Sequence, residues 1–430
     1  MTIEKVVSSN ETTVVVGAGI SGMTTAIELA NLGNKVILIE KEPYIGGRVT
    51  QLYKYFPKLC HPTCGFEINL QKIRASQDIT VLTMAEVIDV AGSEGDFTLK
   101  VKVHPRYIKE TCTACGDCTP ALTSEFDDQY NLGMMKRKGI YRNNNNAYPN
   151  TYTIDPGLLG TDELAEAKKA CKFDAIDEDM AEENIELTAG VVVWATGWTP
   201  YDAAKIQAYG YDRFDNVITN IELERMMDPY GPTGGKILRP SDNTEAKNVA
   251  FIQCAGSRDE NHLPHCSRFC CMASLKQTHY LREKYDDDFE ASIYYIDIRS
   301  IDRFEDFYKK VQNDDNVTFI KSKVASITED DETKNPILHG VDTEGYHRYS
   351  NSHDLIVLAV GMESNVEKDI LPEQIEVNRS NYIEDTSNLP GFYAAGCSTD
   401  ALDVNRSVQQ STATALRALQ SINHISKGNS

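Results

Sequence analysis

Residues 13–40 read TVVVGAGISGMTTAIELANLGNKVILIE, and this stretch decides the fold. The apolar run at residues 13–16 predicts a buried strand, and GAGISG at residues 17–22 predicts the turn from that strand into a helix. The helix is expected over about residues 21–32, before a second strand at residues 35–40. Strand, turn, helix and strand in this order are typical of the βαβ unit that binds a dinucleotide.

The glycines of the turn have separate tasks in such a unit. Gly17 permits the tight turn, Gly19 lets the backbone approach a pyrophosphate, and Gly22 lets the helix pack closely on the strand. The first amides of the helix are free to bind phosphate oxygens. Glu40, at the end of the second strand, is expected to accept hydrogen bonds from a ribose. The unit therefore predicts these cofactor-binding residues: Gly17, Gly19, Ile20, Ser21, Gly22 and Glu40.

Later segments favour FAD over NAD as the dinucleotide. Residues 41–48, KEPYIGGR, resemble the extension in FAD enzymes of the glutathione-reductase type, where a Gly-Gly pair lets the chain pass close to the flavin side. Residues 190–197, GVVVWATG, resemble the strand that closes such an FAD domain, and residues 355–361, LIVLAVG, repeat the pattern. In residues 391–397, GFYAAGC, Cys397 stands where that family usually has an aspartate. The FAD prediction adds Lys41, Gly47, Arg48, Ala195, Thr196, Gly197, Gly361, Gly396, Cys397 and Val404, with a bare NAD site as the alternative.

Cysteines gather in residues 254–271 with the spacing C-x11-C-x3-C-C. Four thiols within 18 residues, two of them adjacent, are hard to explain as core residues. Soft thiolate ligands in this number are what a [4Fe–4S] cluster requires. An apolar run at residues 248–252 predicts a buried strand, which puts the cysteines at the carboxyl end of a sheet. We therefore expect a cluster on Cys254, Cys266, Cys270 and Cys271, with zinc or no metal as the alternatives.

A second cysteine group, C-x2-C-x2-C at residues 112–118, begins like a bacterial ferredoxin motif. Position 122 is a leucine, so the fourth cysteine is missing in line, and residues 170–177 resemble the phrase that closes a ferredoxin's second half. Lys172 stands where that phrase has proline. We expect a ferredoxin-like insertion whose [4Fe–4S] cluster, or alternatively zinc, binds to Cys112, Cys115, Cys118 and Cys171. The Asn-rich residues 142–149 predict a polar surface loop without packing signals.

A second dinucleotide-like domain is expected at about residues 248–354. A helical pattern at residues 271–286 and a strand at residues 291–297 follow its first strand. In a pyridine-nucleotide disulfide reductase, the turn after that first strand is glycine-rich and holds NAD(P)H, whereas here the turn holds cysteines. A hydride donor therefore has no evident site, and we expect electrons to arrive and leave singly by way of clusters.

Composition narrows the classes of function. The chain has 430 residues, 11 cysteines and a net charge of −21, which argues against nucleic acid and anionic membrane surfaces as direct partners. No stretch approaches the ~18 apolar residues of a membrane span, and the first residues lack the basic-then-apolar order of a signal peptide. Many cysteines without an export signal indicate a reducing compartment. We expect a cytoplasmic protein without direct membrane insertion.

Residues 251–259 (FIQCAGSRD), 266–272 (CSRFCCM) and 295–299 (YIDIR) resemble the A subunit of heterodisulfide reductase and its relatives, over about residues 13–418. The resemblance implies a thioredoxin-reductase-like FAD protein with a ferredoxin-like insertion and two [4Fe–4S] clusters, working with the other subunits of a larger complex. It also implies that Lys276 is catalytic, near the flavin N5, with a solvated helix residue as the alternative.

One branch of that family fits the chain best. The compact length and residues 55–65, YFPKLCHPTCG, look like the A subunit of the quinone-interacting membrane-bound oxidoreductase of sulfate reducers. This resemblance implies electron relay between adenylylsulfate reductase and a menaquinol-oxidising membrane subunit, at the inner face of the membrane. A sulfur-oxidising complex of the same type is the near alternative, and a homodimer stays open.

Cys60 and Cys64 form a C-x3-C pair in the same segment. A catalytic dithiol is one interpretation, and thiols that pack near the flavin or at a subunit contact are the favoured one. The dithiol would belong to a rival function, a self-contained NAD(P)H-dependent flavin disulfide reductase. A scaffold with structural zinc is a second rival.

These patterns predict an α/β protein with tandem dinucleotide-binding domains of the thioredoxin-reductase or glutathione-reductase type. The FAD-binding domain is expected in parts, at residues 10–104, 185–220 and 353–425. The ferredoxin-like insertion is expected at residues 105–184, and the second domain, carrying a [4Fe–4S] site, at residues 221–352.

Overall fold

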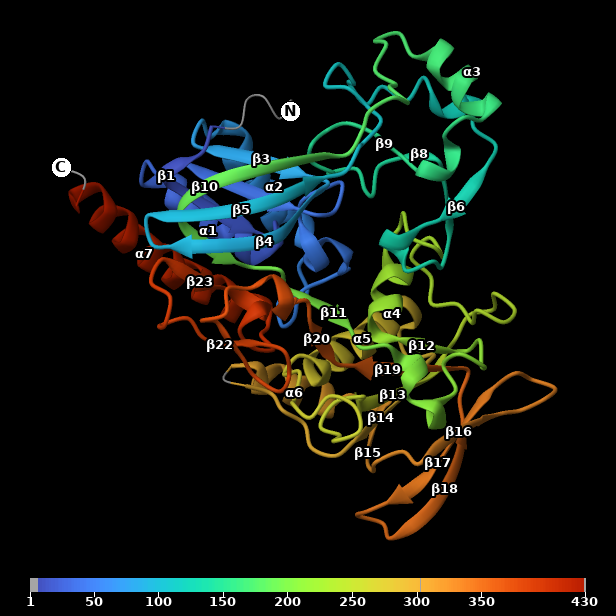
Figure 1. The fold of residues 1–430 in the computed structure, drawn as a ribbon. Helices are drawn as coiled ribbons and strands as arrows, with labels where there is room; N and C mark the ends of the chain where they lie inside the picture. The colour runs from blue at the N-terminus through green and yellow to red at the C-terminus, as the bar shows by residue number, and fades with distance from the viewer. Residues whose placement is uncertain (1–6, 302, 429–430) are drawn as a thin grey trace.

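The structure, a computed structural model, describes residues 7–301 and 303–428. Two large sheets organise this part of the chain, and the segment between β5 and β10 stands beside both of them (Figure 1). The N-terminal sheet, coloured mainly blue, lies with the C-terminal helix, and the second sheet lies below the inserted segment in this view.

The first sheet contains the predicted βαβ unit. Its strands run in the order β3-β2-β1-β10-β5-β4, and β23 also pairs with β10. The long strand β10 runs antiparallel to β5 in its first half and parallel to β1 and β23 in its second half. The bounds are β1 (Ser9–Val16), β2 (Val36–Glu40), β3 (Ile79–Thr83), β4 (Ala85–Ser93), β5 (Asp96–Val103), β10 (Glu183–Trp194) and β23 (Phe392–Ala394).

Alternating side chains of these strands enter two separate cores. Val15 and Val193 belong to a core shared with helices α1 (Ile20–Asn31), α2 (Pro62–Ala75) and α7 (Val404–Gly428). Val14 and Val192, one residue earlier in each strand, belong to the core on the other face. Because successive side chains of a strand point to opposite faces, a continuous apolar run is what a sheet buried on both sides requires.

The second sheet has the order β12-β19-β13-β14-β15 with parallel pairing. Its bounds are β12 (Val217–Thr219), β13 (Asn248–Ala255), β14 (Glu290–Tyr295), β15 (Val317–Lys321) and β19 (Leu355–Val360). Helices α4 (Asn220–Met227), α5 (Cys270–Tyr285) and α6 (Phe304–Gln312) accompany it. The predicted strand and helix of this domain are confirmed as β14 and α5. An antiparallel sheet of β16 (Ser326–Glu329), β17 (Pro336–Asp342) and β18 (His347–Ser352) adjoins it.

The predicted domain limits need correction at two strands. The sequence places strand β19 in the third part of the FAD domain, but it pairs with β13 and β12 in the second sheet. Strand β12 falls within the predicted second part of the FAD domain, but it too lies in the second sheet. The chain crosses between the two sheets through β11 (Trp198–Pro200) and β20 (Met362–Ser364), which pair antiparallel with each other.

The segment between β5 and β10 has a small core of its own, which includes Ile140, Leu158, Leu164 and Ile176. Its elements are β6 (Glu125–Asp127), β7 (Lys136–Lys138), β8 (Ile140–Tyr141), β9 (Thr153–Ile154) and α3 (Asp162–Ala170). Strands β6 and β7 pair, as do β8 and β9, and a short pair, β21 (Glu376–Val377) with β22 (Ile383–Asp385), lies near the C-terminus. An insertion at the predicted place is thus present. Its likeness to ferredoxin rests on the cysteine spacing and stays a prediction.

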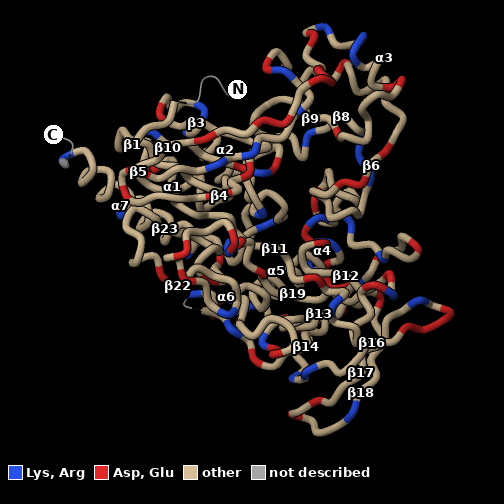
Figure 2. The backbone as a smooth tube through the Cα atoms, in the orientation of Figure 1, with Lys and Arg blue, Asp and Glu red and all other residues tan. Residues whose placement is uncertain are grey.

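Charges of both signs are spread over all parts of the chain that are drawn in colour (Figure 2). Within residues 7–301 and 303–428, no helix has the length and apolar character needed to cross a membrane.

Candidate functional site

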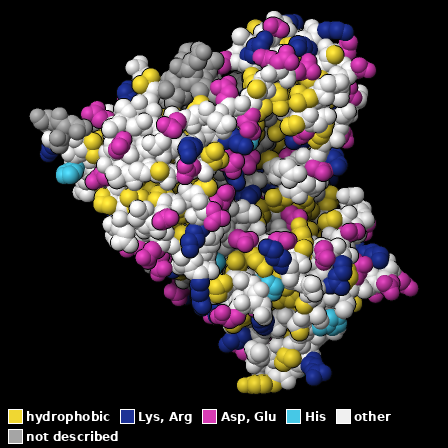
Figure 3. Space-filling model, viewed as in Figure 1, with side chains coloured by type: hydrophobic (Ala, Val, Ile, Leu, Met, Phe, Trp, Pro, Cys, Tyr) yellow, Lys and Arg dark blue, Asp and Glu magenta, His cyan; other side chains and the backbone are white. Residues whose placement is uncertain are grey.

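A cavity of about 780 Å³ lies where the first sheet, the insertion and the second domain meet. The surface is hollowed between the insertion and the second domain, and hydrophobic side chains are visible in the hollow (Figure 3). Most of the residues predicted to bind the dinucleotide line this cavity together: Gly17, Gly19, Ile20, Ser21, Glu40, Lys41, Gly47, Arg48, Ala195, Thr196, Gly197, Cys397 and Val404.

Close glycine contacts shape one side of the cavity. Gly47 has φ +59°, and a Cβ placed on it would lie 2.8 Å from the Cα of Gly19. Gly22 does not line the cavity. A Cβ on Gly22 would lie 1.8 Å from the carbonyl oxygen of Gly17, which is the close helix packing expected of this position. Helix α1 begins after Gly19 with no side-chain cap, so its first amides are available to an anion.

Glu40 is a buried carboxyl group in the cavity wall. Its Oε2 accepts a hydrogen bond from the amide of Ala18 (2.9 Å), and its Oε1 accepts one from the amide of Glu42 (3.0 Å). Burial raises the pKa of Glu40 to about 7, although both amides oppose the rise. Each carboxylate oxygen has a further lone pair, so the group can accept hydrogen bonds from ribose hydroxyls as predicted.

Besides Gly22, two predicted residues, Gly361 and Gly396, lie outside the cavity lining. Gly361 follows β19, and a Cβ there would lie 2.2 Å from Ser257 Oγ, so this glycine packs on the cysteine-bearing turn and not on the dinucleotide side. Gly396 donates its amide to Gln410 Oε1 (2.8 Å) and precedes the cavity-lining Cys397. Burial raises the pKa of the Cys397 thiol to about 11, so this thiol is neutral near pH 7.

Lys276 does not line the cavity, contrary to its expected position beside the flavin. Its ammonium forms an ion pair with Glu224 Oε1 (2.9 Å) and donates to the carbonyl oxygen of Lys54 (2.7 Å). The side chain is also not solvated, because only 2% of Lys276 is exposed. Helix α5 directs Lys276 toward α4, which carries Glu224.

The cysteines of the second domain converge at the carboxyl end of β13, as predicted. Cys254 lies at the end of this strand, whereas Cys270 and Cys271 open helix α5 and are buried. The amide of Arg268 donates to the sulfur of Cys266 (3.4 Å). Burial raises the pKa of Cys270 and Cys271, and the neighbouring thiols of the group raise it further. Without a bound positive centre these thiols therefore stay protonated.

The cysteine group lies close to the cavity, although none of its four members lines it. Cys270 packs in one hydrophobic cluster with Phe269, Met362 and Cys397, all of which also line the cavity. The rings of Trp198 and Phe269 lie 5.3 Å apart across the same wall. The expected cluster site and the expected flavin site thus adjoin the same hydrophobic cluster.

The cysteines of the insertion also converge. Cys112, Cys115, Cys118 and Cys171 line one small cavity, although Cys171 is distant in sequence. The amide of Ala114 donates to the sulfur of Cys112, and the amide of Ala175 donates to the sulfur of Cys171. Both nitrogen–sulfur distances are 3.4 Å. Such contacts favour thiolate ligands.

Lys172, which replaces the expected proline, forms an ion pair with Asp117 (2.9 Å). Because Asp117 precedes Cys118 and Lys172 follows Cys171, the pair joins the two sequence segments of the cysteine group. The substitution is therefore compatible with Cys171 as a member of the set.

Neither group is arranged around a single ion. Among residues 7–301 and 303–428, no three His, Cys, Asp or Glu side chains are placed to hold one metal ion. A zinc ion would need its sulfur ligands at about 2.3 Å from one point. Cys60 and Cys64 are both exposed and lie outside the cavity lining, so a catalytic dithiol beside the dinucleotide site has no support from their positions.

Part of the cavity wall comes from residues that no sequence motif marks. The insertion contributes Tyr130, Arg137, Tyr141, Asn143 and Asn144 to the lining, although the Asn-rich loop is expected from sequence to be a surface loop only. Polar side chains carry no periodic pattern, so only the tertiary structure reveals this role.

Comparisons with known proteins agree with this fold. The family described as an NAD(P)-binding Rossmann-like domain matches residues 15–66. The thioredoxin reductase of T. acidophilum aligns with 98% of this chain and 100% of its own, with a TM-score of 0.52 and 14% identity. That of Lactococcus lactis aligns with 96% and 99%, with a TM-score of 0.52 and 11% identity. These likenesses show the fold alone.

Proteins related in sequence give more specific information than the likeness in fold. The iron-sulfur A subunit numbered 2 of the CoB–CoM heterodisulfide reductase of Methanopyrus kandleri is 38% identical over 418 residues, 94% of this chain and 63% of that protein. The corresponding iron-sulfur protein of Methanocaldococcus jannaschii is 36% identical over 428 residues, 96% of this chain and 64% of that protein. This chain thus spans somewhat less than two thirds of their length. Over that shared length, the chain is similar to the A subunits of heterodisulfide reductases.

Proposed function

We propose that this chain is an electron-transfer subunit that binds FAD and two [4Fe–4S] clusters within a heterodisulfide-reductase-like complex. FAD, when bound, exchanges electrons as a pair or one at a time, and so connects two-electron donors with one-electron clusters. The protein's own task is to bind and orient these groups and to exclude water between them.

The cavity supports FAD as the dinucleotide. Its glycine-lined side leaves room for a pyrophosphate beside the uncapped start of α1, and Arg48 provides a positive charge in the lining. Glu40 would hold the ribose. The ATG segment, Ala195 to Gly197, and Cys397 would lie along the remainder of the molecule.

The cysteine groups support clusters more than zinc. In the insertion, the four sulfurs line one small cavity without closing around one ion, which suits the larger radius of a four-iron core. Cys112, Cys115, Cys118 and Cys171 would hold the cluster of a ferredoxin-like insertion, and Cys254, Cys266, Cys270 and Cys271 the other.

The observation that carries the proposal is the shared packing of Cys270 and the cavity lining. Phe269 and Met362 contact both regions, so a flavin in the cavity would lie within one side chain of a cluster ligand. This proximity suits electron transfer and leaves little room for a nicotinamide between them.

Anaerobic purification with quantitation of FAD, iron and sulfide tests the proposal. We expect one FAD and about eight iron atoms per chain, from two four-iron clusters, and EPR signals after reduction. Zinc in stoichiometric amount without acid-labile sulfide would instead identify a scaffold.

The electron partners belong to the same proposal at a finer level. The names of the relatives associate those proteins with heterodisulfide reductase. The segment with Cys60 and Cys64 favours the branch that relays electrons between adenylylsulfate reductase in the cytoplasm and a menaquinol-oxidising subunit in the membrane. A menaquinol analogue should reduce the clusters only when the membrane subunit is present. Reduction by a sulfur-oxidising partner would favour the neighbouring branch.

A self-contained NAD(P)H-dependent disulfide reductase is the second candidate, since the fold is that of thioredoxin reductase. It predicts rapid bleaching of the flavin by NADH or NADPH in the isolated chain. We expect no bleaching, because the turn after β13 carries cysteines in place of a glycine-rich phosphate loop.

A further inference from the structure

The insertion is bonded to the FAD-type domain along the segment that follows Glu40. The hydroxyl of Tyr44 lies 2.9 Å from the carbonyl oxygens of both Tyr141 and Thr151, and its one proton is shared between these two acceptors. The amide of Ile45 donates to the carbonyl oxygen of Tyr148 (2.9 Å). These bonds hold the Asn-rich loop against the end of the cavity where the predicted ribose ligand lies.

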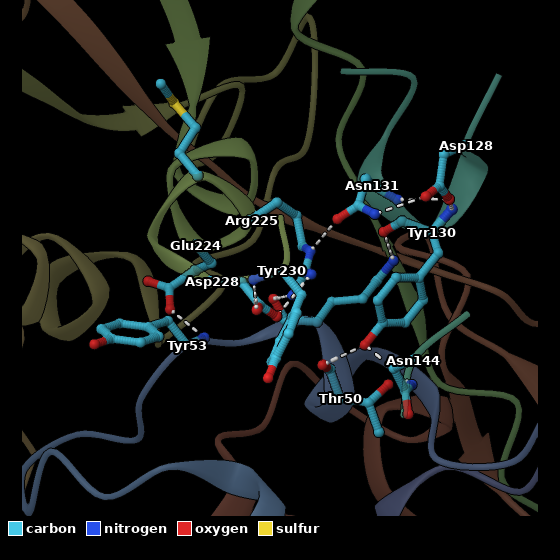
Figure 4. A network of polar contacts seen from close by, with 12 residues as sticks. Thr50, Tyr53, Asp128, Tyr130, Asn131, Asn144, Glu224, Arg225, Asp228 and Tyr230 are labelled. Carbon is cyan, nitrogen blue, oxygen red and sulfur yellow. Dashed lines mark hydrogen bonds and ion pairs between the residues drawn. The ribbon is translucent and has the colours of Figure 1, made fainter. Parts of the chain in front are cut away.

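A second set of bonds lies farther along the same wall. The hydroxyl of Tyr130 donates to the carbonyl oxygen of Thr50 (2.5 Å), and Gln51 Nε2 donates to the carbonyl oxygen of Tyr130 (2.8 Å). Asn144 Nδ2 donates to the hydroxyl of Tyr130 (3.4 Å). Figure 4 shows Asn144 and Thr50 meeting at the Tyr130 hydroxyl. The insertion is therefore hydrogen-bonded to the FAD-type domain at two places, and both places include residues that line the cavity.

Arg225 of helix α4, in the second domain, bonds to both the insertion and the FAD-type domain. Its guanidinium donates to Asn131 Oδ1 (2.8 Å), to the carbonyl oxygen of Gln51 (3.1 Å) and to Asp228 Oδ2 (2.9 Å). It also lies 4.8 Å from the ring centre of Tyr130. Figure 4 shows Arg225 reaching from α4 to the insertion. Because Arg225 is only 2% exposed, these bonds are shielded from water.

We propose that the insertion is part of the dinucleotide site, with Arg137 and Asn144 contacting the adenosine diphosphate half of FAD. The inference rests on the proposed FAD function and extends it to residues outside the nucleotide fold. The position supports the adenosine half, because the lining residues 41–45 directly follow Glu40, and Tyr44 among them bonds to Tyr141 of the insertion. An amide and a guanidinium are suitable donors for ribose and phosphate oxygens.

Arg137 is held in place for such a contact. Its guanidinium pairs with Asp155 (2.8 Å) and lies 3.4 Å from the ring centre of Tyr141, which also lines the cavity. Asp155 uses one oxygen for this pair and the other to accept the amide of Gly157 (3.0 Å). These contacts fix the orientation of the guanidinium, and with it the direction of the N–H donors that remain.

The loop offers a matched pair of variants. Asn144→Ala removes an amide from the cavity lining, whereas Asn145→Ala removes the same group from an exposed position outside it. The full chain with its metal centres, depleted of flavin, is titrated with FAD and separately with ADP or FMN as competitors. We expect Asn144→Ala to weaken FAD and ADP about fivefold, the effect of one lost hydrogen bond, and to leave FMN unchanged. Asn145→Ala should match wild type for all three.

The outcomes separate this inference from the proposed function. If the wild-type chain binds no FAD, the proposed function fails. If wild type binds FAD and Asn144→Ala binds FAD and ADP equally well, only the role of the insertion is overturned. Weakened FMN with unchanged ADP would likewise overturn it, since the loop would then face the flavin half. Tyr130→Phe, which keeps the ring but loses the bond to Thr50, should weaken ADP in the same direction.

Discussion

The ammonium of Lys276 and the carboxylate of Glu224 form an ion pair of 2.9 Å between α5 and α4, with side-chain exposures of 3% and 2%. Glu224 also accepts hydrogen bonds from Gln277 (2.7 Å), Tyr280 (3.0 Å) and the amide of Tyr53 (3.0 Å). Lys276→Met would leave this carboxylate charged and buried without its cation. We expect a loss of about 3–5 kcal/mol in the free energy of unfolding, measured in urea.

A double variant distinguishes this structural role from a catalytic one. Glu224→Gln removes the negative charge but keeps an oxygen that accepts hydrogen bonds, so Lys276→Met combined with Glu224→Gln should recover much of the stability. The flavin spectrum and its reduction by dithionite should match wild type in the recovered protein. Altered flavin reactivity in the double variant would instead show that Lys276 acts at the flavin site.

Cys171 is expected to be the fourth ligand of the insertion centre. Cys171→Ala should lower iron from about eight to about four atoms per chain and leave the EPR signal of the other cluster intact. Cys60→Ala, an exposed cysteine outside both groups, is the control and should keep all the iron. Retention of about eight iron atoms in the Cys171 variant would remove it from the ligand set.

Glu40 should make FAD binding depend on pH. Burial raises the pKa of Glu40 from 4.5 to about 7, so the flavin-free protein binds this proton more tightly than the unfolded chain does. Ribose hydroxyls donate to the ionised carboxylate, and FAD affinity should therefore rise as pH increases toward 7. By the same linkage, the stabilisation of the flavin-free protein by the bound proton is lost as pH rises from 4.5 through about 7.

Titration of FAD at several pH values between about 5.5 and 8 checks this expectation. Glu40→Gln cannot ionise, so its FAD affinity should be weaker and nearly constant over the same interval. A wild-type affinity that does not change with pH would contradict the assigned role of the carboxylate.

His353 should destabilise the fold in mild acid. The ring is neutral and satisfied, because it donates to Asn248 Oδ1 (2.7 Å) and accepts from the hydroxyl of Tyr294 (3.1 Å). Burial lowers the pKa of His353 from 6.5 to about 4. The unfolded chain takes up this proton first as pH falls below 6.5, so up to ~3 kcal/mol of stability is lost before pH 4. His353→Gln should flatten the fall in urea stability between these pH values, whereas His424→Gln, at an exposed position, should not.

The βαβ unit and most of both cysteine groups can be predicted from sequence because their signals are local, whereas Cys171 is added only by the resemblance of residues 170–177 to a ferredoxin phrase. The glycine spacing between β1 and α1 follows from steric needs within one turn, and cysteine spacing reflects a shared ligand demand. The sequence-based prediction for strand β19 is wrong for a related reason: an all-apolar run fits the centre of either parallel sheet, and only its pairing with β13 decides.

Side-chain partners across domains cannot be predicted in this way. The direction of Lys276 depends on Glu224, which lies on another helix, and a lysine in a helical pattern is equally compatible with a solvated face. Arg225 and Asn144 belong to no motif at all, because their roles arise from a junction of distant segments. Such polar junctions become visible only after the chain has folded.

Buried contacts between the domains limit movement about the ribbon of β11 and β20. The two connections between the large sheets pair with each other in this ribbon, so on its own the ribbon could act as a hinge. A swing about it would pull Arg225 from the insertion and Lys276 from the carbonyl of Lys54, exposing two buried cations to a gap. We therefore expect the two large sheets to keep one relative orientation during electron transfer. A fixed distance between the redox centres, and not a domain movement, would then set the rate of transfer.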